Sequence, residues 1–594
     1  MKRTLMGSAV ITLFCLFVSL AETAEAQITE SVSITCSSSG QLCDPPYTSS
    51  ITVAVRGVVT AEFTASPGHC STMKAHIGID GVEKAVSAIL GPGESTDAVE
   101  LGTVSAGNHS VFVKAEGQVT GCNVGRISSW GGTLRITLPV APGIRGSLAH
   151  FTSQDGWQED IVVLNTGSNT TSSTLKFLAE NGSTMPVSLT DSRAGTTAVL
   201  STQEADLVSR SILPLTSRGS PTLPLLVGST LLYGSQALDG FGIFRFKPTN
   251  QEAVVPLETR DATSYILAFD NTNNVSTGVA ISNVTAVAAS VEVIIRNDQG
   301  IQIGTAPIQL AGNGHTSFVL ADQLPLTRNL RGTLEIVTPD RGRLSAVGIR
   351  FTPPGTLTTI PILVNAANPS GSIAHFAAGG GWRSILVLVN AGTSSAQAHL
   401  RFYDDAGNPA TLPLTRPQTP GPATPASAVD QTLAAKQVFV LESNGAPGAG
   451  DPLRTGSVQF TSDGSIHGFV VFRYEPNGQE AAVAMESRST ATSYTIAFDN
   501  TDGVVTGIAV NNASATGASV PVIIRDENAA QIFSGSLLLP GNGHTSFLLA
   551  SQYVVTANKR GTIEFLRPDP SKIGVVGIRS QPALTFTSLP AIAR

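Results

Sequence analysis

A long internal duplication constrains this chain more than any other feature. Gly146-Ser-Leu-Ala-His-Phe151 with Gly156-Trp157 recurs as Gly371-Ser-Ile-Ala-His-Phe376 with Gly381-Trp382, and Gly312-Asn-Gly-His-Thr-Ser-Phe318 recurs unchanged as Gly541–Phe547. The offsets are 382 − 157 = 225 and 544 − 315 = 229 positions, so one long block was copied. Self-similarity at a fixed period marks modular arrays, which build surface from one packed unit. The duplication therefore favours a binding or structural role over catalysis.

Each copy of the block divides again into two kinds of module. Four apolar segments carry an arginine near their end, at Arg245, Arg350, Arg473 and Arg579. Four earlier apolar runs end in asparagine, at Asn165, Asn283, Asn390 and Asn512. We therefore predict four modules of alternating type, named A1 (141–258), B1 (259–364), A2 (365–487) and B2 (488–594).

Strands and turns are the expected structure inside a module. Phe244 and Phe246 alternate with Arg245, which predicts a half-buried antiparallel strand with the arginine on its solvent face. Turns are predicted where Asn or Asp precedes Gly, at 179–182, 297–300 and 404–407. The Pro-rich segment Thr415–Ala435 predicts a surface loop. About seven strands in about 100 residues outline a two-sheet sandwich, so the expected fold is all-β, a tandem array of immunoglobulin-like antiparallel β-sandwiches.

Residues 1–26 have the pattern of a secretory signal peptide. Lys2 and Arg3 precede an apolar stretch from Leu5 to Leu20, and Ala24-Glu-Ala26 offers a small-residue cleavage site. The predicted mature protein begins at Gln27, is exported to the cell surface, medium or periplasm, and is not inserted in a membrane. Its charge agrees with this destination: a net charge of −7 without a basic cluster disfavours nucleic acid and anionic membranes as partners.

The segment 27–140 lacks the repeats and carries four cysteines, which predicts a separate disulfide-containing β-sandwich. Strands are expected at Ser50–Val58, Ser110–Glu116 and Thr133–Leu138. Four cysteines in an exported domain allow three pairings, of which we predict Cys36–Cys43 and Cys70–Cys122. Zinc is the alternative, disfavoured because the segment has no Cys-x-x-Cys spacing.

Five side chains are candidates for ligand binding. Trp130, Trp157 and Trp382 suit either a sugar-stacking platform or a plug in the core, and the core is favoured because Trp157 and Trp382 immediately precede an apolar strand. His315 and His544 invite a catalytic role. Both follow a Gly-Asn-Gly turn, however, and no Gly-x-Ser-x-Gly nucleophile motif accompanies them, so a structural role is favoured.

No cofactor is expected, with calcium as the alternative left open. Phe269-Asp-Asn-Thr272 and Phe498-Asp-Asn-Thr501 carry suitable oxygens, but their spacing departs from that of a calcium loop. An Asx-turn between strands is the favoured interpretation.

The region 141–594 resembles modules of uncharacterised exported bacterial proteins. The resemblance rests on Ala149-His-Phe151 with Gly156-Trp157, on Gln251-Glu-Ala-Val-Val-Pro256, on Ser264-Tyr-Ile-Leu-Ala-Phe-Asp-Asn271 and on Gly312–Phe318. It implies tandem immunoglobulin-like β-sandwiches and a surface or secreted role, and it brings no catalytic or binding residues.

The expected function is thus structural, adhesive or ligand-binding at the bacterial cell exterior, without enzymatic activity. The expected partner is an extracellular protein or polysaccharide. Carbohydrate binding through the tryptophans, a secreted hydrolase using the histidines, and calcium-stiffened adhesion remain as alternatives.

Overall fold

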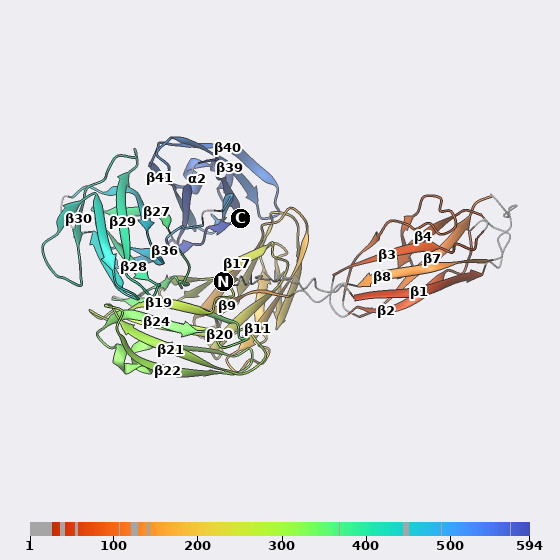
Figure 1. The fold of residues 1–594 in the computed structure, drawn as a ribbon, viewed down its shortest axis with the longest axis horizontal. Helices are drawn as coiled ribbons and strands as arrows, with labels where there is room; N and C mark the ends of the chain where they lie inside the picture. Colours follow the sequence, from red (N-terminus) through yellow and green to blue (C-terminus); the bar gives the residue numbers. More distant parts are fainter. Residues whose placement is uncertain are drawn as a thin grey trace, which may run out of the picture. The chain divides into compact units, whose positions relative to one another are not determined.

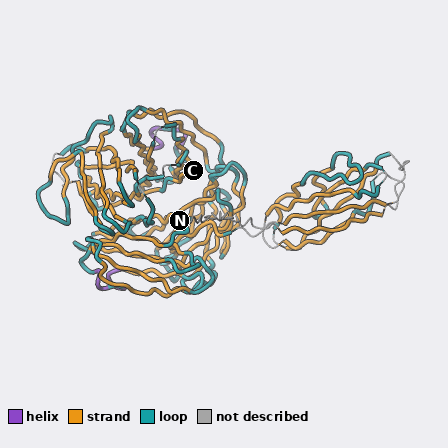
Figure 2. The backbone as a smooth tube through the Cα atoms, in the orientation of Figure 1, coloured by secondary structure: helices purple, strands orange, loops and turns teal. Residues whose placement is uncertain are grey.

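The computed structural model describes residues 26–35, 42–53, 57–69, 71–105, 107–119, 129–138, 143–353, 355–367, 369–443, 451–488, 490–570 and 572–594. They divide into two compact units, unit 1 (Met1–Pro142) and unit 2 (Gly143–Arg594). The described chain is almost entirely antiparallel strand and turn (Figure 2), as the sequence predicts. Two four-residue helices, each followed by a single 3₁₀ turn, are the exceptions among the described residues.

Unit 1 is a sandwich of two four-stranded sheets, ordered β1-β8-β3-β6 and β2-β7-β4-β5. Its strands are β1 (Ala26–Thr35), β2 (Tyr47–Val53), β3 (Gly57–Ala65), β4 (Met73–Ile79), β5 (Val82–Val86), β6 (Val99–Val104), β7 (Gly107–Gly117) and β8 (Ser129–Leu138). The predicted strand 50–58 is therefore shared between β2 and β3. Strict alternation of buried and exposed residues along β3 reflects one face on the core.

Modules A1 and A2 each pair a four-stranded with a six-stranded sheet. The strands of A1 are β9 (Ile144–Ser153), β10 (Trp157–Asn165), β11 (Thr171–Ala179), β12 (Val187–Asp191), β13 (Thr196–Leu200), β14 (Thr202–Leu207), β15 (Ile212–Ser217), β16 (Leu226–Gly234), β17 (Leu238–Phe246) and β18 (Gln251–Pro256). Those of A2 are β27 (Ser370–Ala378), β28 (Trp382–Asn390), β29 (Ala396–Asp404), β30 (Leu412–Thr415), β31 (Thr424–Ala426), β32 (Ala428–Leu433), β33 (Val438–Ser443), β34 (Arg454–Ser462), β35 (Ile466–Tyr474) and β36 (Gln479–Ala484). The predicted loop Thr415–Ala435 is thus wrong in part, because β31 and β32 extend both sheets of A2 within it.

Modules B1 and B2 are smaller two-sheet units of the same design as each other. B1 contains β19 (Ser264–Asp270), β20 (Ser276–Asn283), β21 (Ala289–Asn297), β22 (Gln302–Leu310), β23 (His315–Val319), α1 (Leu320–Gln323), η1 (Pro325–Thr327), β24 (Arg331–Val337), β25 (Leu344–Thr352) and β26 (Thr356–Ile360). B2 contains β37 (Ser493–Asp499), β38 (Val505–Asn512), β39 (Ala518–Asp526), β40 (Gln531–Leu539), β41 (His544–Leu548), α2 (Leu549–Gln552), η2 (Val554–Thr556), β42 (Arg560–Leu566), β43 (Ile573–Ser580), β44 (Phe586–Leu589) and β45 (Ile592–Ala593).

The four modules of unit 2 form a closed ring (Figure 1). Each module has a hairpin near its C-terminal end, and the second strand of that hairpin lies at the centre of the ring. There β18 of A1 and β36 of A2 each contact both β26 of B1 and β44 of B2. The six-stranded sheet of A1 packs its outer face on B2, and that of A2 packs on B1. B1 packs in turn on A1, and B2 on A2. The ring is therefore closed between its first and last modules without a covalent connection.

The repeated asparagines end their strands as predicted and close the following loops. The Asn165 amide donates to the carbonyl oxygens of Leu207 and Val208, while its own oxygen accepts from the Gly167 N–H. Asn390 makes the equivalent bonds in A2. A side-chain amide can satisfy both donors and acceptors that a strand end leaves unpaired, which explains its recurrence at this position.

Candidate functional site

The four repeated arginines lie in the seams between modules, and the predicted solvent-facing position is wrong. The alternation along β17 is as expected, but both faces of its sheet are buried: Phe244 packs in the core of A1, while Ile243 packs against B2. The face that a single sandwich leaves in water is covered here by the next module. The arginines on this face therefore sit among carboxylates in a partly dry environment.

The seam between B2 and A1 has Arg579 at its centre, with 6% of its side chain exposed. Its guanidinium lies 3.4 Å from Glu252, 3.7 Å from Asp160 and 3.1 Å from Asp499. Arg245 approaches the first two carboxylates from A1, at 2.6 Å from Glu252 and 3.3 Å from Asp160. Burial alone would lower the pKa of Arg579, but the three carboxylates raise it overall, so it stays charged. The cluster fixes B2 against A1 through paired charges.

The seam between B1 and A2 repeats this arrangement with fewer carboxylates around the central arginine. Arg350 of B1 lies 3.0 Å from Glu480 of A2 and 3.5 Å from Asp270 of its own module. Arg473 approaches Glu480 at 2.9 Å. Burial alone would raise the pKa of Asp270, but Arg350 and Arg331 lower it overall, so this carboxylate is ionised at neutral pH.

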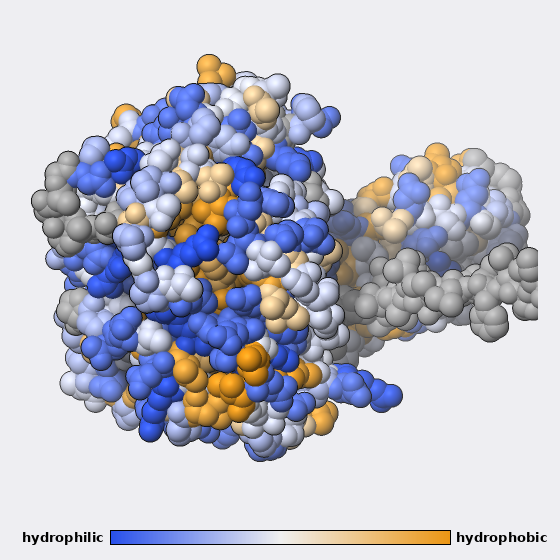
Figure 3. Space-filling model, turned by 60° about the vertical axis from the view of Figure 1, so that its left-hand side comes forward, coloured by the Kyte–Doolittle hydropathy of each residue, from blue (hydrophilic) through white to orange (hydrophobic). Residues whose placement is uncertain are grey.

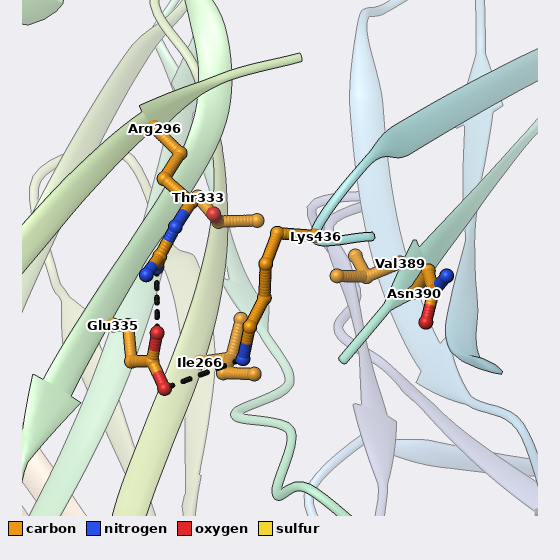
Figure 4. Close-up of a pocket in the computed structure, with 7 residues that line it drawn as sticks. All are labelled: Ile266, Arg296, Thr333, Glu335, Val389, Asn390 and Lys436. Atoms are coloured by element: carbon orange, nitrogen blue, oxygen red, sulfur yellow. Dashed lines mark hydrogen bonds and ion pairs between the residues drawn. The ribbon is translucent and has the colours of Figure 1, made fainter. Parts of the chain in front are cut away.

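A second ionic group lies further along each of these seams. Glu335 of B1 accepts from Arg296 at 2.6 Å and lies 3.5 Å from Lys436 of A2 (Figure 4). Glu564 of B2 takes the same place between Arg525 at 2.8 Å and Arg210 of A1 at 3.4 Å. The gap around Glu335 has no room for a water molecule. It is a packed joint between modules rather than a ligand pocket.

The repeated histidines lie in the other pair of seams, where each meets a second histidine. His315 of B1 is 4% exposed and its Nε2 lies 3.2 Å from Nδ1 of His150 in A1. In the second copy, Nε2 of His544 in B2 lies 2.9 Å from Nδ1 of His375 in A2. Nδ1 of His544 lies 2.8 Å from Oδ1 of Asp405. Burial lowers the pKa of His150 to about 4, and burial with the neighbouring His544 lowers that of His375 to about 3.

The glycines of the histidine motif allow close backbone contacts between modules. The β-turn at Gly182 of A1 lies against Gly312 of B1 so closely that a Cβ on Gly182 would come 2.0 Å from the Gly312 carbonyl oxygen. Gly407 and Gly541 repeat this contact in the second copy. The backbone N–H of His315 donates to the Glu180 carbonyl, and that of His544 to the Asp405 carbonyl. The motif is thus a backbone docking site between modules.

Glu159 is a buried carboxylate that only the first copy contains. One of its oxygens accepts from the Thr152 N–H at 2.9 Å, while the other has no hydrogen-bond partner among the described residues. Burial raises the pKa of Glu159 well above its usual range. Ser384 occupies the equivalent position in A2 and exchanges two hydrogen bonds with Ala377.

The three tryptophans pack against other rings. Trp130 is 3% exposed in the core of unit 1, with the His69 ring at 4.4 Å. The ring centroid of Trp157 lies 4.9 Å from that of Phe246. The ring centroid of Trp382 lies 4.9 Å from that of Tyr474 and 5.5 Å from that of Phe586. Trp130 therefore offers no open ring face, and the other two are half-buried.

Cys36, Cys70 and Cys122 lie outside the described residues, as does the predicted signal peptide, so both disulfide pairings stay predictions. Cys43 is buried in the core of unit 1 and is disulfide-bonded. The Asp-Asn-Thr segments form the predicted Asx-turns: Asp270 accepts from the backbone and hydroxyl of Thr272, and its other oxygen faces Arg331 and Arg350. Within the described ranges no cluster of three or more His, Cys, Asp or Glu could hold a metal ion.

An open hollow in the described part of unit 1 has a volume of about 390 Å³. His109 lies in it, held by Asp80 at 2.7 Å and by the Ser105 carbonyl at 3.0 Å. Both ring nitrogens are therefore engaged within the domain. The hollow is a shallow surface beside β2 and β7, lined by Ser50, Ile51, Thr52, Asp80, Asn108, His109 and Ser110.

Comparisons with known proteins do not identify a family. No family model matches the chain, and neither does any curated protein. Among solved structures, dimeric latent PorU from Porphyromonas gingivalis is 6% identical with a TM-score of 0.12, covering 96% of this chain and 86% of that one. A mutant Salmonella alpha-2-macroglobulin is 10% identical (TM-score 0.12, covering 92% and 39%), and the trypsin-activated protein from Escherichia coli is 8% identical (TM-score 0.10, covering 93% and 47%). None of the helices described is long and apolar enough to cross a membrane.

The carboxylate partners of the arginines are the residues that sequence reasoning missed. Gln251-Glu-Ala recurs as Gln479-Glu-Ala, and in both copies the glutamate follows the arginine of the preceding strand by seven residues. That constant spacing places Glu252 and Glu480 beside their arginines across a hairpin. It is the signal by which these pairs can be recognised.

Proposed function

We propose that this protein is an exported, non-enzymatic structural or adhesive protein of the bacterial cell exterior, in which unit 2 serves as a rigid platform. We also assign the modules to the immunoglobulin-like class, as the resemblance of 141–594 implies. The partner in this proposal is an extracellular protein or polysaccharide.

One observation carries the proposal. The recurrent titratable side chains of unit 2, the arginines, their carboxylates and the histidines, face one another inside the seams between modules. A reactive site needs such groups in an accessible concave pocket with a reacting atom within reach. Here they pair with each other, so their chemistry contributes to rigidity.

The outer surface supports a binding role. Figure 3 shows apolar side chains gathered in patches between polar ones on one face of the molecule. Contiguous exposed apolar surface is typical of contact sites for other proteins.

The proposal is tested by measuring whether the labelled chain 27–594 binds intact bacterial cells and isolated surface polysaccharides. We expect saturable binding that is lost when the chain is thermally unfolded. Trp157→Ala and Trp382→Ala test the sugar alternative, because binding to isolated polysaccharide weakens if it depends on stacking against these rings. A hydrolytic activity that stays with the folded chain through purification and vanishes on unfolding would contradict the proposal.

A further inference from the structure

The edge strand β40 leaves one side of its backbone unpaired. It pairs with β39 and ends the sheet ordered β40-β39-β42-β37-β45. No described backbone group bonds to it from the other side, and it lies on the outer rim of unit 2 (Figure 1). Edge strands are templates for pairing, and proteins usually block them with charges or proline. The nine residues of β40 include neither.

The sequence of β40 is symmetric about Gly535. Ile532-Phe533-Ser534 precedes the glycine and Ser536-Leu537-Leu538 follows it, so apolar residues and serines mirror one another. In a two-fold symmetric contact, each residue meets in the partner the residue that meets it in return. Antiparallel pairing centred on Gly535 places Ser534 opposite Ser536. The symmetric ladder ends there, because the register shift between Ile524 and Arg525 makes Ile532 the extra residue of a β-bulge.

The backbone direction agrees with this register. The Asp526 N–H donates to the Ala530 carbonyl across the hairpin, so the even-numbered residues of β39 face β40. Val522 pairs with Gly535, which directs Gly535 and its odd-numbered neighbours inward and Ser534 and Ser536 outward. Ser534 and Ser536, which the symmetric register pairs, are thus residues whose N–H and C=O groups point away from β39.

The sibling strand β22 of B1 provides a comparison within the same chain. Pro307 occupies the position of Ser536, as the shared offset of 229 and the pairing of Pro307 with Glu292 and of Ser536 with Pro521 show. Proline has no N–H to donate at this outward position, so β22 cannot form the same ladder. The copied edge is blocked in B1 and open in B2, where Leu538 is 77% exposed.

We propose that two copies of this chain associate through antiparallel pairing of β40 with β40 about Gly535. The contact joins the two outer sheets into one continuous sheet across a two-fold axis. Leu538 lies on the exposed face of that sheet, whereas Ile532 packs against the core of B2.

The first experiment is sedimentation velocity on the mature chain 27–594 between about 1 and 100 µM. We expect a concentration-dependent dimer. Ser536→Pro, which copies the sibling strand, and Leu538→Lys, which adds a charge to an exposed position, each raise the dissociation constant about tenfold or more. Gln309→Lys, the equivalent change on β22, leaves it unaltered. Circular dichroism and melting temperature establish that each variant is folded.

The second experiment fixes the register. When Ser534→Cys chains are mixed with Ser536→Cys chains, the symmetric register places the two new cysteines opposite each other at about 5.5 Å between Cα atoms, within disulfide range. Neither variant alone places two cysteines opposite each other. We expect a covalent dimer from the oxidised mixture that reductant reverses, and none from either variant alone. A wild-type chain that stays monomeric, or a dimer that survives both single substitutions without cross-linking, overturns the proposal.

Discussion

The two copies within unit 2, A1–B1 and A2–B2, share one packing scheme but differ in the polar side chains of their seams. Where B2 meets A1, Arg579 faces three carboxylates; where B1 meets A2, Arg350 faces two. The difference is Asp160, whose equivalent in A2 is Ile385. The seam with the extra carboxylate is the one that closes the ring without a chain connection. Paired side chains there join two modules that do not follow each other in the sequence.

Removing Arg579 tests this difference with the largest expected effect. We expect Arg579→Ala to lower the free energy of unfolding by about 3–5 kcal/mol, because Glu252, Asp160 and Asp499 lose the positive charge that they share in a buried seam. Arg350→Ala is expected to cost less, since two carboxylates remain. Arg401→Ala, at an exposed pair with Asp430, is the control and should change stability by less than about 0.5 kcal/mol. Urea denaturation measures all three, and equal losses for Arg579→Ala and Arg401→Ala would refute the buried role.

Acid should loosen the histidine seams. The pKa of His150 is about 4 in the folded chain and near 6.5 when unfolded, so the unfolded state binds more protons between these values. Stability is therefore full above about pH 6.5 and falls as pH drops toward 4, by up to about 3 kcal/mol for this group. The lower pKa of His375, about 3, extends the loss in the second copy to lower pH.

Unfolding midpoints measured from pH 7.5 to 4.5 check this dependence. The double variant His150→Leu/His315→Leu should flatten it, because it removes both titrating rings from the A1–B1 seam. A slope unchanged in that variant would assign the pH dependence to other groups.

The turn contact should be equally sensitive in both copies. Gly182→Ala places a Cβ 2.0 Å from the Gly312 carbonyl oxygen, and Gly407→Ala does the same at Gly541. We expect each to cost about 2–3 kcal/mol in thermal unfolding. Gly195→Ala is the matched control: its φ is also positive but its Cβ would meet open space, so only the backbone cost of about 1 kcal/mol applies. A loss at Gly182 no larger than at Gly195 would show that the turns separate without penalty.

The smallest effect is expected at Glu159. Glu159→Gln keeps the acceptor for the Thr152 N–H and removes a buried acid, so we expect a gain of about 1 kcal/mol at pH 7.5. Because burial raises the pKa of Glu159, the wild-type group destabilises increasingly as pH rises above 4.5, and the gain should shrink toward pH 4.5. Ser384→Ala in the other copy, which removes two hydrogen bonds, should instead destabilise.

The strands were accessible to sequence reasoning because their signals are local. The asparagine-terminated runs became β10, β20, β28 and β38 with the predicted last residue. The turns at Gly182, Gly300 and Gly407 follow from residues that tolerate positive φ. Neither prediction needed knowledge of what lies next to a module.

The positions of the arginines were not accessible in the same way. Alternation in β17 separates Phe244 from Arg245 correctly, but it cannot distinguish a face in water from a face covered by a neighbouring module. Likewise the Pro-rich segment before Leu433 reads as a loop, although pairing with β29 and β30 makes strands of it. Both errors arose where partners outside the segment itself decide the structure.

By itself, the sequence determined that this chain is all-β, duplicated and built from two alternating kinds of module. Strand periodicity, turn residues and copied motifs are all patterns of residues close together in the sequence. Only the tertiary structure decided that the modules close into a ring and that the copied arginines, histidines and glycines meet inside it. Burial depends on which surfaces face each other in space. A repeated sequence specifies the surface of each module, but it does not specify which of these surfaces pack against one another.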